Sequence, residues 1–143
     1  MKRDERLIFL LATAQQAVKK HANKALAAEG VRITIAQSGI LFLLKQQDRR
    51  MISELGKILG IENSAMTGLV DRLEKSGFVT RVADPTDRRA SLICATPAGL
   101  DEVGRAKPII RRVNDSIKAG FSENEIEVLK RVLGGILQRF TGR

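Results

Sequence analysis

The side chains best suited to binding chemistry lie on a predicted helix that runs from about residue 63 to residue 76. The face opposite its apolar side carries small or polar residues: Ser64, Ala65, Thr67, Gly68, Asp71 and Arg72. The hydroxyls of Ser64 and Thr67 can reach base edges or phosphates in the major groove of duplex DNA, and Gly68 permits close backbone approach. For an isolated helix, a solvated polar face is the commoner explanation, so the pattern needs support from its neighbours.

Two residues of this helix keep alternatives open. Either Asn63 or Ser64 can cap its start, because both side chains accept hydrogen bonds from free backbone donors. Arg72 either contacts a phosphate or braces the helix through the nearby Asp71 or Glu74. The residue types alone do not choose between these two roles.

A second group of polar residues follows at 83–89, a charged and turn-rich segment between strand-forming segments at 78–82 and 90–95. We expect a hairpin with a protruding tip. Arg88 or Arg89 can enter a minor groove, whose negative potential attracts guanidinium groups, while Asp87 orients the arginine. Two basic and two acidic residues leave the tip without net charge, so its shape must support any DNA binding.

The elements before this region are predicted from hydrophobic spacing and capping signals. An amphipathic helix at 7–28 ends near Gly30, and a capping box of Thr34 and Gln37 begins a second helix with a buried apolar centre. Ser53 is the expected N-cap of a short third helix at 54–59 that Gly60 ends.

The elements after the hairpin are predicted in the same way. Thr96 followed by Pro97 begins a helix that should reach about Ala119, with a kink at Pro108. Ser122 and Glu125 form a second capping box that begins the last helix.

This order of elements defines the expected fold class, because a short helix, a glycine turn and a polar-faced helix precede a two-stranded hairpin. We expect a mainly α fold with a small β-hairpin wing. A winged helix-turn-helix lobe at 31–99 would carry the binding residues, and residues 1–30 and 100–143 would form a helical dimerisation region. The 143 residues suit a single domain.

The first and last helices present more apolar surface than one lobe can cover, and such patches usually mark an interface. The first helix contributes Leu7 and Leu11. The last helix contributes a broad stripe: Ile126, Leu129, Val132, Leu133, Ile136, Leu137 and Phe140. The sequence therefore predicts a homodimer.

Residues 52–56, 64–79 and 84–89 closely resemble the multiple-antibiotic-resistance regulator (MarR) family. The most diagnostic part is the wing pattern Asp-x-Arg, alternating apolar residues and Thr-Pro-x-Gly. Here it reads Asp87, Arg89, Ile93, Ala95, Thr96, Pro97 and Gly99. The resemblance implies an interlocked dimer with two DNA-reading lobes one helical turn apart, in which Arg89 inserts into DNA and Asp87 is its salt-bridge partner.

The resemblance implies a sequence-specific regulator of transcription, with repression favoured, that acts as a homodimer on a pseudo-palindromic operator and is often released by a small-molecule effector. No aromatic cage or convergent charge in the sequence identifies such an effector. Two alternatives are a winged-helix module for protein contacts only and an oxidant sensor that uses Cys94. The sensing cysteine of such relatives lies in the N-terminal helix, which has none here, so a small, partly buried apolar role suits Cys94 better.

The composition bounds the partners and the compartment. A net charge of +9 and a pI near 10.3 favour polyanions, which include nucleic acid and anionic membranes. The apolar run at 7–11 is too short to span a bilayer, so no membrane partner is expected. With five Phe and no Trp or Tyr, stacking on single strands is disfavoured. A single cysteine suits the reducing cytoplasm.

Enzymatic chemistry is not expected. The sequence holds no nucleophile elbow, no phosphate-binding glycine loop and no metal-ligand spacing, and His21 is its single histidine. We therefore predict no catalytic residues, no metal site and no cofactor.

Overall fold

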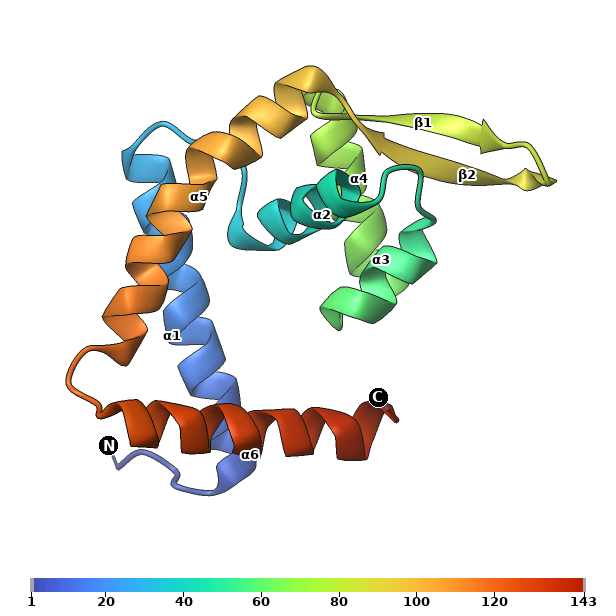
Figure 1. Cartoon of the computed structure of the whole chain (residues 1–143). Helices are drawn as coiled ribbons and strands as arrows, with labels where there is room; N and C mark the ends of the chain where they lie inside the picture. The colour runs from blue at the N-terminus through green and yellow to red at the C-terminus, as the bar shows by residue number, and fades with distance from the viewer. Residues whose placement is uncertain (1, 143) are drawn as a thin grey trace.

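The computed structural model describes residues 2–142, and within them the chain forms six helices and one two-stranded hairpin (Figure 1). In chain order the elements are α1 (Leu7–Ala28), α2 (Ile35–Gln46), α3 (Ile52–Leu59), α4 (Asn63–Lys75), β1 (Val79–Asp84), β2 (Asp87–Ala95), α5 (Pro97–Lys118) and α6 (Glu123–Thr141). The predicted fold class, mainly α with a β-hairpin wing, is confirmed.

The strongest local signals in the sequence begin helices where they were predicted. The Gln37 backbone N–H donates to the Thr34 hydroxyl at 3.2 Å, and the Thr34 backbone N–H donates to the Gln37 side chain at 2.9 Å. The same reciprocal pair joins Ser122 and Glu125 at the start of α6. These caps satisfy donors that the first turn would otherwise leave free, which fixes the helix starts.

Two predicted caps are wrong. The short helix α3 begins at Ile52 rather than after Ser53, and Met51 stands at its N-cap without a side-chain hydrogen bond. Its start is set by packing, because Ile52 lies against the core and Leu55 is fully buried. Likewise Asn63 lies inside the first turn of α4 after an extended Glu62, so neither Asn63 nor Ser64 is the cap.

The core of the lobe forms where α2 packs against α3 and α4. Ile40 and Leu41 of α2 are fully buried, as is Met66 of α4. Glycines in the left-handed region end both neighbouring helices, Gly60 with φ 69° after α3 and Gly77 with φ 81° after α4. The first turn redirects the chain from α3 into α4, and the second redirects it from α4 into β1.

The hairpin is longer and its turn tighter than the sequence predicted. Residues 83, 84 and 87–89 belong to β1 and β2, so the expected loop at 83–89 is wrong. The Asp84 carboxylate accepts hydrogen bonds from both the backbone N–H and the hydroxyl of Thr86, which closes the turn. At the base of the wing, the backbones of Arg50 and Ile93 form an isolated antiparallel β-bridge, which ties the segment before α3 to β2.

The helices α1, α5 and α6 extend away from the lobe (Figure 1). The helix α5 starts with the predicted Thr96 cap and stays one helix through Pro108, bending along its length as it passes from the wing to α1. No residue of α6 is buried. Among residues 2–142, no helix is both long enough and apolar enough to cross a bilayer.

Candidate nucleic-acid interface

The helix α4 presents one face to the core and the other to solvent. Met66, Val70 and Leu73 are at most 1% exposed, which fixes the rotation of the helix. The small polar face predicted from the sequence is therefore turned outward, with Gly68 half-buried and the rest exposed. The Thr67 hydroxyl donates its proton to the Asn63 carbonyl at 2.9 Å, which leaves its oxygen to act as an acceptor.

The angle between α3 and α4 depends on a glycine that the sequence reasoning did not single out. A Cβ at Gly56 would lie 2.7 Å from the Ile61 carbonyl oxygen and 2.9 Å from Cγ of Met66. The missing side chain lets the turn after α3 fold back over it, and the Ile61 N–H donates to the Gly56 carbonyl at 2.9 Å. Gly56 and Gly60, four residues apart around the turn between α3 and α4, were the signal in the sequence for this close approach.

Arg72 lies over the exposed surface of α4. Its guanidinium nitrogens are 3.5 and 4.0 Å from where a Cβ of Gly68 would be. Within residues 2–142, no ion pair or side-chain hydrogen bond involves Arg72. The bracing role that the sequence left open for Arg72 is therefore wrong, and phosphate contact stays a prediction.

The two carboxylates expected to brace Arg72 are held by Arg81, which the sequence reasoning missed. From β1, its Nη2 lies 2.6 Å from Oδ1 of Asp71, and its Nη1 lies 2.6 Å from Oε1 of Glu74. The hydrogen bond to Asp71 raises the pKa of the guanidinium further above its ordinary value, and the Glu74 carboxylate adds to this shift. One side chain of the wing, Arg81, thus binds two carboxylates of α4.

The wing tip exposes the arginine that the resemblance singled out. The Arg89 side chain is 94% exposed, and Arg88 is exposed beside it. The Asp87 carboxylate accepts the Arg89 backbone N–H at 3.0 Å and lies 3.6 Å from its Nε. The ion pair implied for Asp87 and Arg89 is present, and it restrains the arginine at the tip.

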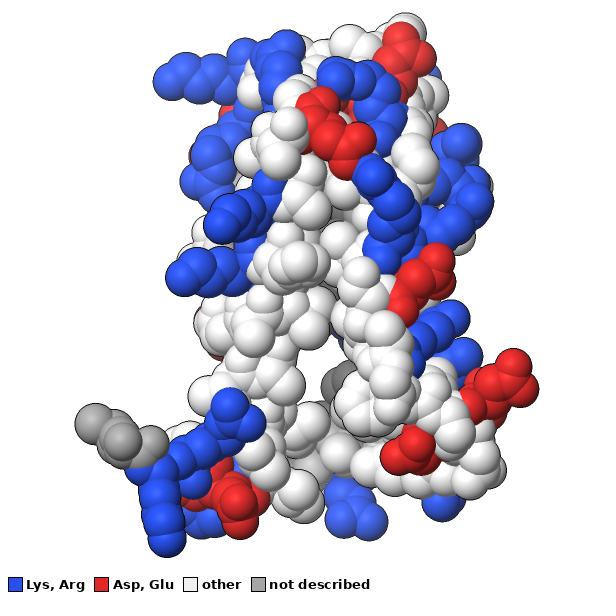
Figure 2. All heavy atoms as spheres, turned by 90° about the vertical axis from the view of Figure 1, so that its left-hand side faces the viewer, with Lys and Arg blue, Asp and Glu red and all other residues white. Residues whose placement is uncertain are grey.

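Net charge does not concentrate on the winged lobe. Residues 31–99 carry ten basic and seven acidic side chains, so this lobe holds only +3 of the +9 of the whole chain. Figure 2 shows lysines and arginines on both sides of a largely uncharged strip on the opposite side of the molecule from the wing. Attraction of a polyanion to the lobe must therefore come from the placement of individual arginines.

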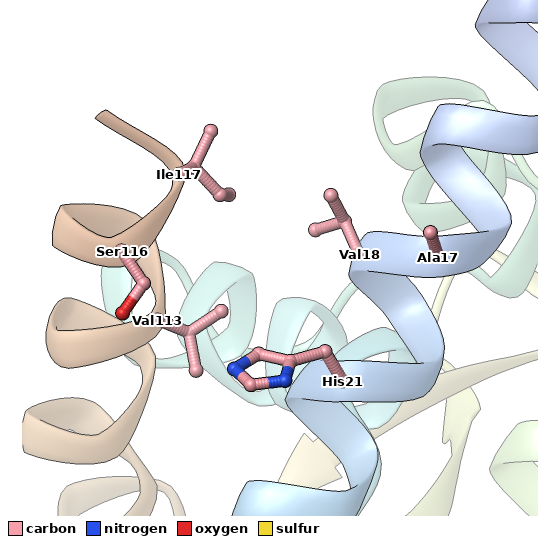
Figure 3. A pocket seen from close by; sticks show the side chains of 6 residues that line it. All are labelled: Ala17, Val18, His21, Val113, Ser116 and Ile117. Carbon is pink, nitrogen blue, oxygen red and sulfur yellow. The ribbon is translucent and has the colours of Figure 1, made fainter. Parts of the chain in front are cut away.

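A shallow groove separates α1 from α5, with a volume of about 340 Å³. Figure 3 shows the side chains that line it: Ala17, Val18, His21, Val113, Ser116 and Ile117. The lining is mainly apolar, and His21 is the one titratable group in it. Across residues 2–142, no group of histidine, cysteine or acidic side chains is arranged to hold a metal ion.

Cys94 lies on β2 with 9% of its surface exposed. Burial raises the pKa of its thiol, and the negative charge of Asp48 adds to this effect. A raised pKa lowers the thiolate fraction on which oxidation depends, which favours the apolar role predicted for this residue.

The fold and the exposed helix and wing define a winged helix-turn-helix protein. The MarR family model matches residues 33–91. A transcriptional activatory protein of Rhodopseudomonas palustris, BadR, is 31% identical over 126 residues, which cover 85% of this chain and 70% of that protein. The chain belongs to the MarR family of transcriptional regulators and is not an enzyme.

Other similar proteins support the same family. The chain is 33% identical to the transcriptional regulator YcgE of Bacillus subtilis over 95 residues, which cover 64% of this chain but only 60% of YcgE. The solved structure of the transcriptional repressor CouR bound to a 23-mer DNA duplex superposes with a TM-score of 0.81 at 28% identity, covering 92% of both chains. Proteins of this fold therefore include DNA-bound regulators.

Proposed function

We propose that this protein is a cytoplasmic regulator that binds double-stranded DNA sequence-specifically, as a homodimer on a pseudo-palindromic operator, and represses transcription. The observation that carries the proposal is the pairing of two exposed elements on one lobe. The small polar face of α4 suits a major groove, and Arg89, 94% exposed at the wing tip, suits the neighbouring minor groove. In this proposal residues 31–99 bind DNA and the flanking helices dimerise.

The proposed homodimer is supported by the apolar surface that the single chain leaves open. On α6, Leu129, Val132 and Leu133 are 38–46% exposed, and Phe140 is 79% exposed. On α1, Leu7 is 73% exposed. A 19-residue helix without one buried residue gains little by folding alone, so a second copy of the same surface is its natural partner.

Repression and release by an effector are the finer parts of the proposal. The similarity to CouR, a repressor, supports repression, although BadR is described as an activator. The expression of a reporter gene placed behind the bound promoter decides between repression and activation. The apolar groove between α1 and α5 would suit an apolar effector, whose addition should lower operator occupancy.

A titration against DNA tests the central proposal. The purified protein is added to labelled DNA from upstream of its own coding sequence and to random-sequence DNA, each at two salt concentrations. We expect selective binding that persists at physiological salt, with a steep salt dependence from several phosphate contacts. Weak, sequence-indifferent binding that disappears at physiological salt would instead support a winged-helix module used for protein contacts.

Replacing Arg89 by alanine is expected to weaken operator binding by about 1 to 3 kcal/mol. The side chain makes no contact with the core, so the variant should keep the stability and the oligomeric state of the parent. Fluorescence anisotropy measures the affinity, and sedimentation measures the oligomer. Operator binding as tight as that of the parent would remove the wing from the proposed interface.

A further inference from the structure

The outer face of α4 carries two negative charges that oppose DNA binding. Asp71 follows Thr67 by one helical turn and so lies on the same outward face, and Glu74 lies beside it. Their side chains are 58% and 40% exposed. Carboxylates in this position would repel phosphates, and they also lie near the C-terminal end of the helix, where the macrodipole disfavours negative charge.

Arg81 is placed to cancel both charges at once. It lies two residues after the buried Val79 on β1, so its side chain points to the same side of the strand, toward α4. Its two terminal nitrogens bind different carboxylates, each at 2.6 Å. A guanidinium offers such donors in a fixed plane, and this geometry restrains the angle between wing and helix as well as the charge.

We infer that Arg81 is a positioning residue for DNA binding, which neutralises Asp71 and Glu74 and holds the wing against α4 without itself contacting DNA. This inference rests on the proposed function. The side chain is 28% exposed and lies against the two acids. Because Arg81 occupies both carboxylates, Arg72 remains available to phosphates.

A double-mutant cycle separates this role from a direct DNA contact. Operator affinity and its salt dependence are measured for the parent, Arg81→Gln, the pair Asp71→Asn with Glu74→Gln, and the triple variant. We expect Arg81→Gln alone to weaken binding about tenfold, because two uncompensated carboxylates then face the phosphates. Where both acids are already neutral, the same change should alter affinity by less than about twofold.

A different result would overturn the inference. If Arg81 contacts DNA itself, Arg81→Gln costs the same in both backgrounds and lowers the slope of log affinity against log salt by about one. If Arg81→Gln binds as tightly as the parent, the inference fails while the proposed function stands. If the parent itself does not prefer promoter DNA, the proposed function fails.

Two further variants make the test independent of folding and of general charge. Arg81→Lys keeps the positive charge but not the planar fork, so we expect a smaller loss of operator affinity, about threefold. If this variant binds as tightly as the parent, the guanidinium does not hold the wing against α4. Arg111→Gln removes one exposed arginine from α5, outside the winged lobe, and should bind nearly as the parent does. Partly exposed ion pairs add little stability, so unfolding temperatures should change little. If Arg81→Gln does not fold, Arg81→Met, which is likewise uncharged and of similar length, takes its place in the cycle.

Discussion

Replacing Leu133 by glutamate is expected to convert the proposed homodimer into a monomer and to weaken operator binding by about a hundredfold or more. Leu133 lies within the apolar stripe of α6, 38% exposed in the single chain. A charge there costs little in the isolated subunit, but a self-complementary interface would bury it twice, once from each copy. A monomer keeps only one lobe and loses the half-site contacts that its partner supplies.

The matched control is Arg131→Glu, on the opposite side of the same helix. It introduces the same glutamate outside the stripe, so the dimer should survive. Sedimentation velocity reports the oligomer, and anisotropy on operator DNA reports binding. A dimeric Leu133→Glu protein would show that α6 is not the interface, and a monomeric protein with full affinity would separate dimerisation from DNA binding.

The parts of the fold that the sequence predicted are those set by local chemistry. The capping boxes at Thr34 and Ser122 place helix starts because donor and acceptor lie three residues apart. The apolar face of α4 was also predicted from local spacing, because the helical repeat brings Met66, Val70 and Leu73 to one side. Such signals are complete within a few residues and need no knowledge of the fold.

The errors arose where tertiary packing decides the local structure. Ser53 has the chemistry of a cap, but burial of Leu55 and packing of Ile52 extend α3 past it. The segment at 83–89 has the composition of a loop, yet five of its seven residues belong to β1 and β2. Propensity was outweighed by contacts to residues elsewhere in the chain.

The features that were missed depend on separate segments that meet in space. Arg81 is ten positions from Asp71, and nothing in the spacing favours it over Arg72 as the partner. The pairing of Arg50 with Ile93 at the base of the wing is still more remote in the sequence. The sequence identified the groups that carry the candidate site, but only the fold shows which charges are already paired.

Gly99 gives the second prediction with a large effect. It is buried in the first turn of α5, where an added Cβ would overlap the Phe78 carbonyl oxygen and lie 3.0 Å from its carbonyl carbon. The same carbonyl accepts the Thr96 backbone N–H at 3.1 Å, and the Thr96 hydroxyl donates to Gly77 at 2.6 Å. Gly99→Ala should therefore push α5 off the end of α4 and lower the free energy of unfolding by about 3 kcal/mol.

Gly104 provides the control on the same helix. It is exposed, and a Cβ there would meet nothing within 4 Å. Gly104→Ala should therefore raise the free energy of unfolding by about 0.5 to 1 kcal/mol, since alanine restricts the unfolded chain and favours helix. Urea denaturation of both variants measures the contrast. Equal stabilities of the two variants would mean that α5 can move away from Phe78 at little cost. The close approach of Gly99 to Phe78 would then not anchor α5 to the winged lobe.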